Sequence, residues 1–246
     1  MQTVWITGAS KGIGAALALH FAQQGWRVIA SARNADELTS VIDQHENCLA
    51  LVADVCERDK PDQWLADWCV SSGIKQLDAV VINAGTAEYI DVPDIDVDKF
   101  RRVFDLNVMG AMQTVRWAMP LMQAGSRFVF VSSMATLLPF TRAQAYASSK
   151  AALDYIASSL QTDLLEQGIG ITVIKPGFIK TPLTDKNDFS MPFIITPEQA
   201  APRMFKAITK GKRLHHFPKR MLGLLTVLRC LPKGMQHRLL ADKRGK

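Results

Sequence analysis

The chain has 246 residues, 48% of them hydrophobic, and a formal net charge of +6, which suits one large α/β domain over residues 1–246 with a substantial core. No stretch reaches the roughly 18 to 20 apolar residues of a membrane-spanning helix, and the N-terminus has no signal-peptide pattern, so we expect a cytoplasmic protein. Four cysteines without a C-x-x-C pair or other metal spacing favour buried thiols over disulfides and predict no metal site.

The first elements along the chain are a strand, a glycine-rich loop and a helix. An apolar run from Val4 to Thr7 precedes the loop, and helical periodicity from Ala15 to Gln24 follows it. In such a unit the glycines let backbone amides close on a pyrophosphate, while the helix N-terminus points its partial positive charge at that group. A glycine triplet also occurs in ordinary tight turns, but the flanking strand and helix favour a nucleotide site. The loop residues assigned to it are Gly8, Ser10, Lys11, Gly12, Ile13 and Gly14.

The end of the next predicted strand, Arg27–Ala32, decides which dinucleotide we expect. About 20 residues after the glycines a carboxylate would bind the ribose hydroxyls of NAD. Ala32 stands there instead, with Arg33 behind it and Lys11 inside the loop. Two cations without a carboxylate suit the 2′-phosphate of NADP. We therefore predict NADP(H) over NAD(H); the alternative is that Arg33 is an ordinary surface residue.

Four further apolar runs predict strands at 48–53, 77–82, 128–131 and 171–175, with helical patterns between most of them, and 214–217 is a candidate for a seventh strand. This alternation predicts a parallel sheet covered by helices on both faces, with ligands at the carboxyl ends of the strands. Candidate site residues follow those ends: Asp54, Val55, Asn83, Ala84, Gly85, Ser133, Pro176 and Gly177.

Two stretches leave alternatives open. A helical pattern from Phe100 to Met122 contains Asn107 among apolar residues, so its amide is either a satisfied core group or part of a polar network. The irregular stretch from Thr184 to Ile195 is either a mobile flap over the site or an ordinary surface connection.

Tyr146 and Lys150 open a predicted helix in which small and apolar residues recur at helical spacing. Being four residues apart, their side chains share one helix face. At roughly 4 Å and an effective dielectric constant of about 20, a phenolate and an ammonium attract by on the order of 4 kcal/mol, or about three pKa units. We therefore expect Lys150 to lower the pKa of Tyr146 toward neutrality. Taken alone, such a pair is usually a half-buried ring beside a surface cation.

Together these motifs resemble the short-chain dehydrogenase/reductase family from about Thr3 to Phe217. The resemblance is carried by Thr7–Gly14, Asn83–Gly85, Asn107, Ser133, Tyr146 with Lys150, and Pro176–Gly177 leading to Thr181. The family's serine precedes its tyrosine by 13 residues, which selects Ser133 over Ser132. The resemblance implies a Rossmann-like, doubly wound sheet of seven strands. It also implies a homodimer or homotetramer assembled through the helices that hold Asn107 and Tyr146.

The resemblance implies four catalytic residues. Tyr146 would exchange a proton with the oxygen of a carbonyl or alcohol substrate, to which Ser133 would donate a hydrogen bond. Lys150 would hold the nicotinamide ribose and lower the pKa of Tyr146. Asn107 would support a water chain that reaches Lys150.

The resemblance further implies contacts of Ile179 and Thr181 with the nicotinamide carboxamide, and of Asp54 and Val55 with the adenine. These roles predict an NADP(H)-dependent oxidoreductase that interconverts a carbonyl and an alcohol, on an apolar substrate and without a nucleic-acid partner. The alternative is a non-catalytic NADP-binding sensor or scaffold on the same fold.

Beyond Phe217 the resemblance fades. Residues 218–246 form a C-terminal extension in which the apolar run Met221–Leu231 lies between basic residues. One interpretation is a helix that packs over the substrate pocket or at a subunit interface, and this is the one we favour. The other is a basic amphipathic segment that rests on a membrane surface. The run is too short to span a bilayer.

Overall fold

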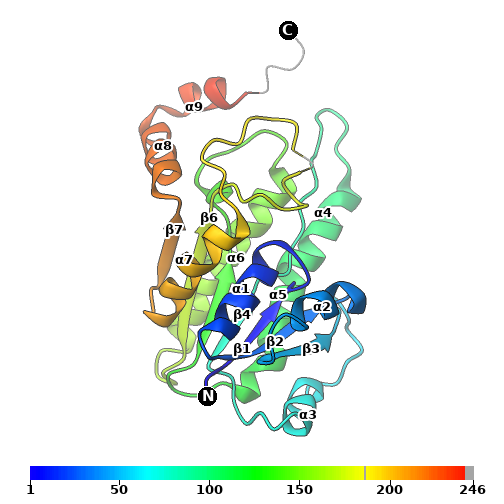
Figure 1. Cartoon of the computed structure of the whole chain (residues 1–246). Helices are drawn as coiled ribbons and strands as arrows, with labels where there is room; N and C mark the ends of the chain where they lie inside the picture. Colours follow the sequence, from blue (N-terminus) through cyan, green and yellow to red (C-terminus); the bar gives the residue numbers. More distant parts are fainter. Residues whose placement is uncertain (186, 242–246) are drawn as a thin grey trace.

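Seven parallel strands form one sheet in the computed structural model, which describes residues 1–185 and 187–241 (Figure 1). The strand order is β3-β2-β1-β4-β5-β6-β7. The strands are β1 (Thr3–Thr7), β2 (Arg27–Ala32), β3 (Cys48–Val52), β4 (Ala79–Ile82), β5 (Arg127–Val131), β6 (Gly170–Pro176) and β7 (Leu214–Phe217). The expected Rossmann-like α/β fold is confirmed, because the order reverses direction beside β1 and helices connect the parallel strands.

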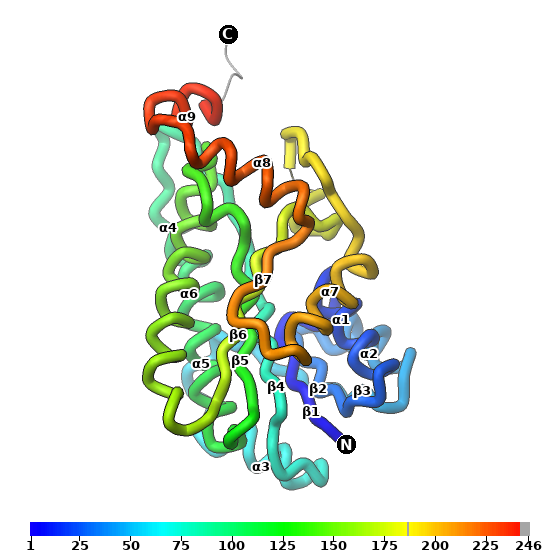
Figure 2. The backbone as a smooth tube through the Cα atoms, turned by 90° about the vertical axis from the view of Figure 1, so that its left-hand side faces the viewer, coloured from blue at the N-terminus to red at the C-terminus, as the bar shows by residue number. Residues whose placement is uncertain are grey.

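Helices pack on both faces of this sheet (Figure 2). The helices of the described residues are α1 (Gly12–Gln23), α2 (Ala35–Ile42), α3 (Trp64–Ser71), α4 (Val97–Phe104), α5 (Gly110–Ala118), α6 (Gln144–Asp163), α7 (Pro197–Thr209), α8 (Lys219–Cys230) and α9 (Lys233–Leu240). The side chains of α1, α2 and α7 share one apolar core with one face of the sheet, and those of α3, α5 and α6 share a second core with the other face.

Strand β1 shows how the sequence feeds both cores. Val4 and Ile6 belong to the core under α1 and α7, whereas Trp5 between them belongs to the opposite core. All three are fully buried, because a central parallel strand is covered on both sides. The indole Nε1 of Trp5 donates to Ser31 Oγ at 2.9 Å, so the buried ring leaves no donor without a partner.

The helical pattern from Phe100 to Met122 is confirmed as far as Leu121, although the helix is not regular along its whole length. Helix α4 ends at Phe104, a π-helical turn runs from Asp105 to Met109, and α5 then begins at Gly110. A short 3-10 turn, Met119–Leu121, closes the unit. The wider π turn lies where Asn107 is drawn inward to backbone and side-chain partners, and such local bonds compete with regular helical pairing.

The C-terminal extension continues from β7 into α8 and α9, which lie at the end of the molecule opposite the N-terminus (Figure 1). Met221 and Leu225 of α8 pack with Met134 and Leu138, which follow β5. Among the described residues, no helix is both long and apolar enough to cross a membrane. The basic residues at the end of the sequence, Lys243, Arg244 and Lys246, lie outside the described residues.

Candidate active site

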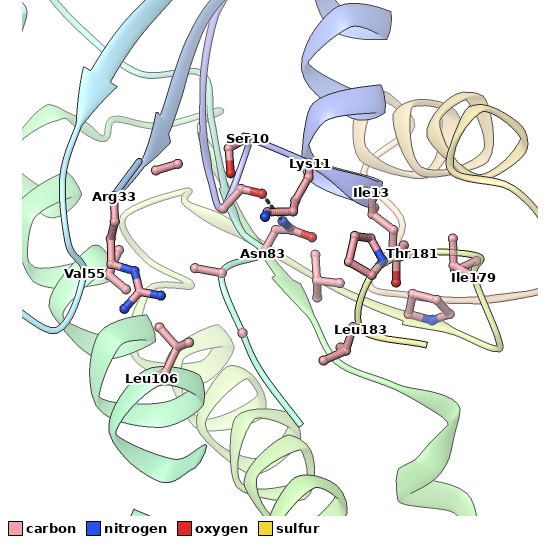
Figure 3. A pocket seen from close by; sticks show the side chains of 18 of the residues that line it. Ser10, Lys11, Ile13, Arg33, Val55, Asn83, Leu106, Ile179, Thr181 and Leu183 are labelled. Atoms are coloured by element: carbon pink, nitrogen blue, oxygen red, sulfur yellow. Dashed lines mark hydrogen bonds between the residues drawn. The ribbon is translucent and has the colours of Figure 1, made fainter. Parts of the chain in front are cut away.

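A cavity of about 770 Å³ opens at the carboxyl ends of the central strands. Figure 3 shows Arg33 and Val55 at one end of it, Ile179 and Thr181 at the other, and Lys11 with Asn83 between them. The residues predicted from sequence that line it are Gly8, Ser10, Lys11, Gly12, Ile13, Arg33, Asp54, Val55, Asn83, Ala84, Gly85, Ser133, Tyr146, Lys150, Pro176, Gly177, Ile179 and Thr181. Gly14 and Asn107 are not part of its wall.

The loop between β1 and α1 is built for close approach of another group. Gly8 has a φ of +66°, and a Cβ there would meet Ala84 Cα at 2.8 Å. Gly12 has a φ of +58°, and a Cβ there would lie 3.0 Å from Thr181 Cγ2. Helix α1 begins at Gly12 with no acidic residue in its first turn, so its partial positive charge is not opposed there. Loop and helix together fit the pyrophosphate of a dinucleotide.

Asn83 fastens this loop to the end of β4. Its Nδ2 donates to Thr7 O at 3.0 Å and to Gly8 O at 3.1 Å, and the Thr7 hydroxyl accepts from the backbone amides of Asn83 and Ala84. Gly14 lies behind the loop, where a Cβ would stand 2.2 Å from Gly8 O. The missing side chain of Gly14 permits α1 to pack against the loop, and its assignment to the cofactor site stays a prediction.

The end of the cavity beside β2 contains a carboxylate that the sequence argument overlooked. Glu37 of α2 lines the cavity, accepts from Lys11 Nζ at 2.9 Å and accepts from Ser10 Oγ at 3.2 Å. The hydrogen bond from Lys11 holds the pKa of Glu37 below its usual value. Arg33 lies 3.8 Å from Asp54, with most of its side chain exposed. The two expected cations, Lys11 and Arg33, thus line the cavity, but the expectation that no carboxylate accompanies them is wrong.

A sequence signal for Glu37 did exist. Asn34 stands three residues before it and caps α2 by accepting from the Glu37 amide at 3.1 Å. That Asn-x-x-Glu spacing is typical of a helix start. Because this helix begins directly after β2, a glutamate in its first turn lies near the carboxyl end of that strand, where the site was expected. Leu106, Leu183 and Thr184 also line the cavity, but they carry no motif that would have singled them out.

Ser133 and Tyr146 meet at the same wall of the cavity. Ser133 caps the short 3-10 turn Met134–Leu137, where its Oγ accepts from Ala135 N at 3.0 Å. Burial raises the pKa of Tyr146, and a hydrogen bond with Ser133 opposes that rise only in part. The expectation that Lys150 brings this pKa toward neutrality is therefore wrong for this structure, because desolvation of the phenolate outweighs the other effects.

Lys150 lies one turn further along α6 and is only 5% exposed. Its Nζ donates to the backbone oxygen of Val131 at 2.8 Å, and a Cβ on Gly85 would lie 3.4 Å from it. Burial lowers the pKa of Lys150 to about 8, an effect that the charge of Asp154 offsets in part. The ammonium is thus anchored to the end of β5 at the cavity wall.

Asn107 is fully buried behind the wall and belongs to a polar network. Its Oδ1 accepts from Thr86 N at 2.8 Å, and its Nδ2 donates to Thr86 O and to Ser149 Oγ, both at 2.9 Å. Ser149 Oγ in turn donates to Tyr146 O at 2.7 Å. Asn107 therefore ties the loop after β4 to the helical turn that carries Tyr146.

A second network lies beneath the turn that carries Ser133. Lys175 Nζ, on β6, donates to Thr136 Oγ1 at 3.0 Å, and Thr136 Oγ1 donates to Ser133 O at 3.0 Å. Lys175 also pairs with Asp154, which follows Lys150 by one turn of α6. No motif in the sequence pointed to Asp154, Thr136 or Lys175 as neighbours of the site.

The irregular stretch after β6 is attached to neighbouring loops by an ion pair and by ring contacts. Arg142 pairs with Asp188 at 3.3 Å and with Asp91 at 2.7 Å. The ring of Phe189 packs against Tyr89 and Phe178, with centroids 6.2 and 6.0 Å away. Lys186, within this stretch, lies outside the described residues. These contacts join the stretch to the loops before α4 and α6.

Comparison with known proteins agrees with this geometry. A family model described as short chain dehydrogenase matches residues 2–190. An uncharacterized oxidoreductase of Myxococcus xanthus is 33% identical over 95% of this chain and 94% of its own length, and one of Staphylococcus epidermidis is 28% identical over 85% and 92%. A short-chain dehydrogenase structure from Streptomyces avermitilis has a TM-score of 0.78 at 24% identity, covering 92% of both chains. The chain belongs to the short chain dehydrogenase family, and it is an oxidoreductase of that type.

Proposed function

We propose that this protein is an NADP(H)-dependent oxidoreductase that interconverts an apolar ketone or aldehyde with its alcohol. The observation that carries the proposal is the convergence of Ser133, Tyr146 and Lys150 on one cavity that the glycine loop also lines. A bound nicotinamide cofactor supplies or accepts the hydride. The residues of the chain contribute binding, orientation and proton transfer.

Tyr146 acts as the proton donor to the carbonyl oxygen during reduction. Because burial raises its pKa, the phenol stays protonated near neutral pH, and the protonated form is the one that can donate. Ser133 donates a hydrogen bond to the same oxygen and stabilises the charge that develops on it. In the oxidative direction Tyr146 must first lose its own proton, and the resulting phenolate accepts the proton of the alcohol.

Lys150 and Asn107 hold this arrangement in place. The Lys150 ammonium, anchored on Val131 O, is available to hydroxyl groups at the cavity wall and places a positive charge beside the reacting groups. Asn107 fixes the turn of α6 through Ser149, so we assign it a positioning role in addition to the expected water chain.

The cofactor is proposed as NADP(H) because two cations, Arg33 after β2 and Lys11 of the glycine loop, line the cavity. Glu37 opposes this charge, but its pair with Lys11 is largely exposed, and exposed pairs are weak because water and salt screen them. A 2′-phosphate, with nearly twice the charge of a carboxylate, can displace Glu37 from Lys11.

An apolar substrate is proposed because apolar side chains follow directly on the proposed catalytic ones. Met134 succeeds Ser133 and packs with Met221 of α8, and Phe178 borders the same cluster. A Cβ on the cavity-lining Gly177 would approach Met221 at 3.3 Å, so α8 begins close to the cavity.

The test is consumption of NADPH across a panel of ketones and aldehydes, with Tyr146→Phe as the variant and Tyr155→Phe as its control. Tyr155 lies on the same helix but is 79% exposed and does not line the cavity. We expect Tyr146→Phe to lose a factor of about 100 or more in kcat and Tyr155→Phe to lose none. Tight NADPH binding without turnover on any substrate would favour a cofactor-binding sensor or scaffold instead.

A further inference from the structure

The helices α8 and α9 form a C-terminal hook, defined as Lys219–Leu240, that continues from β7. Its inner face packs on the body of the protein through Met221 and Leu225, with Leu240 at the margin of the same cluster. In Figures 1 and 2 the hook lies at the end of the molecule opposite the N-terminus.

The corner of the hook is held by a buried glutamine. Gln236 is 2% exposed, and its Nε2 donates to Arg229 O at 2.9 Å and to Leu231 O at 2.7 Å. These two carbonyls end α8 and have no partner within the helix. The side chain of one helix therefore caps the other, and the two helices keep a defined relation to each other.

The outer face of the hook exposes large apolar side chains. Leu224 is 41% and Val227 66% exposed on α8, three residues apart on one face, and Met235 is 48% and Leu239 57% exposed on α9, four residues apart. Exposed basic side chains accompany them: Lys219, Arg220, Arg229, Lys233 and Arg238. An apolar stripe flanked by cations is the pattern of a helix that lies in the interface of a bilayer.

The charge of this region is entirely of one sign. From Gln199 to Ala241 the sequence contains no aspartate and no glutamate. In a two-fold symmetric contact the same patch would face itself, so two copies would bring these cations together. The hook also contains no Phe, Trp or Tyr, the residues that stack on bases in single-stranded nucleic acid. Charge and apolarity together fit an anionic lipid surface.

We propose that the C-terminal hook docks the protein peripherally on an anionic phospholipid membrane. Leu224, Val227, Met235 and Leu239 enter the boundary between headgroups and acyl chains, while the basic side chains contact lipid phosphates. The docking surface is separate from the glycine cradle and from Ser133, Tyr146 and Lys150. Its test therefore does not depend on turnover.

The experiment is co-sedimentation of the full chain with phosphatidylcholine vesicles that either contain or lack phosphatidylglycerol. We expect binding to the anionic vesicles that weakens as salt is added, and at least about tenfold weaker binding to the neutral ones. Absence of binding to the anionic vesicles at low salt would overturn the proposal.

Two variants and two matched controls locate the surface. Arg220→Gln/Arg229→Gln/Arg238→Gln removes three charges from the hook, and Lys206→Gln/Lys210→Gln/Lys212→Gln removes three exposed charges before it. Leu224→Ser/Val227→Ser removes apolar area from the hook, and Val70→Ser/Leu165→Ser removes exposed apolar area elsewhere. The hook variants should bind at least about tenfold more weakly, and the controls should bind as the parent does.

Folding and assembly are read on the same samples. Circular dichroism with thermal melting shows whether each variant is folded, and the test uses only those that melt like the parent; single substitutions replace any that do not. Light scattering gives the number of subunits. Equal loss of binding in hook variants and controls would overturn the proposal, as would a hook variant that dissociates an oligomer, since the face would then be a subunit interface.

Discussion

The carboxylate of Asp154, which follows Tyr146 and Lys150 at four-residue spacing on α6, lies 2.5 Å from the ammonium of Lys175 on β6. Both side chains are mostly buried, at 23% and 13% exposure. The pair joins α6 to β6, and through Thr136 it reaches the backbone of Ser133. One ion pair therefore supports both the turn that carries Ser133 and the helix that carries Tyr146.

Removing one partner of this pair should destabilise the protein. Asp154→Asn leaves the Lys175 ammonium buried without its counter-charge, so we expect a loss of about 2 to 4 kcal/mol in the free energy of unfolding. Urea unfolding gives the value. Asp62→Asn breaks the exposed pair with Arg116 and should cost less than about 1 kcal/mol. Asp154→Asn/Lys175→Met should cost less than the sum of its single changes; strict additivity would show that the two side chains do not interact.

Lys150 makes stability depend on pH. Its pKa is about 8 in the folded protein, against an ordinary value of 10.5, so between these values the unfolded chain binds more protons. Stability should therefore rise with pH through this window, by about 1 kcal/mol from pH 8 to pH 9 for this group. Well below pH 8 Lys150 is charged in both states, and its contribution to the slope vanishes.

The measurement is the free energy of unfolding across this pH range for the parent and for Lys150→Met, which keeps the length of the side chain without its charge. The variant should have the smaller rise. Equal slopes would mean that the Lys150 ammonium is not desolvated in the folded protein.

The two adjacent serines at the end of β5 should differ in importance. Ser133→Ala removes the hydroxyl that bonds with Tyr146 and should lower kcat about 100-fold. Ser132 is buried, and its hydroxyl donates to Lys150 O at 3.4 Å, a long bond, so Ser132→Ala should stay within about threefold of the parent. Steady-state kinetics with the best ketone of the panel checks both, and the reverse ranking would exchange their roles.

The preference for NADPH should respond in opposite directions to two charges. Arg33→Asp should weaken NADPH relative to NADH by about tenfold or more, because it replaces a cation at the cavity end by an anion. Glu37→Gln should strengthen NADPH relative to NADH, because it frees Lys11 from its carboxylate.

Dissociation constants for both cofactors measure this preference. Arg58→Asp makes the same charge change at an exposed residue outside the cavity wall and should leave the ratio unchanged. If Arg33→Asp leaves the ratio unchanged as well, the 2′-phosphate is not bound at this end of the cavity.

The sequence by itself determined the strands and the order of motifs along the chain. Continuous apolar runs such as Ala79–Ile82 can be buried on both faces only as central parallel strands, and this is a local property of composition. Local backbone geometry also explains the other motifs. The positive φ values at positions 8 and 12 favour glycine, and a spacing of four residues places Tyr146 and Lys150 on one helix face. Local patterns were therefore sufficient to predict that most of the site residues lie at one edge of the sheet.

Only the tertiary structure decided the charges and the burial at that edge. Glu37 belongs to α2, whereas the loop that it contacts precedes α1. Asp154 pairs with Lys175, which lies 21 residues later in the sequence. The direction of the shift in the pKa of Tyr146 depends on how much protein surrounds the phenol. The spacing of two residues on a helix does not contain this information. Desolvation and long-range pairing are sums over neighbours from the whole chain, whereas strand and helix patterns depend on residues close in sequence.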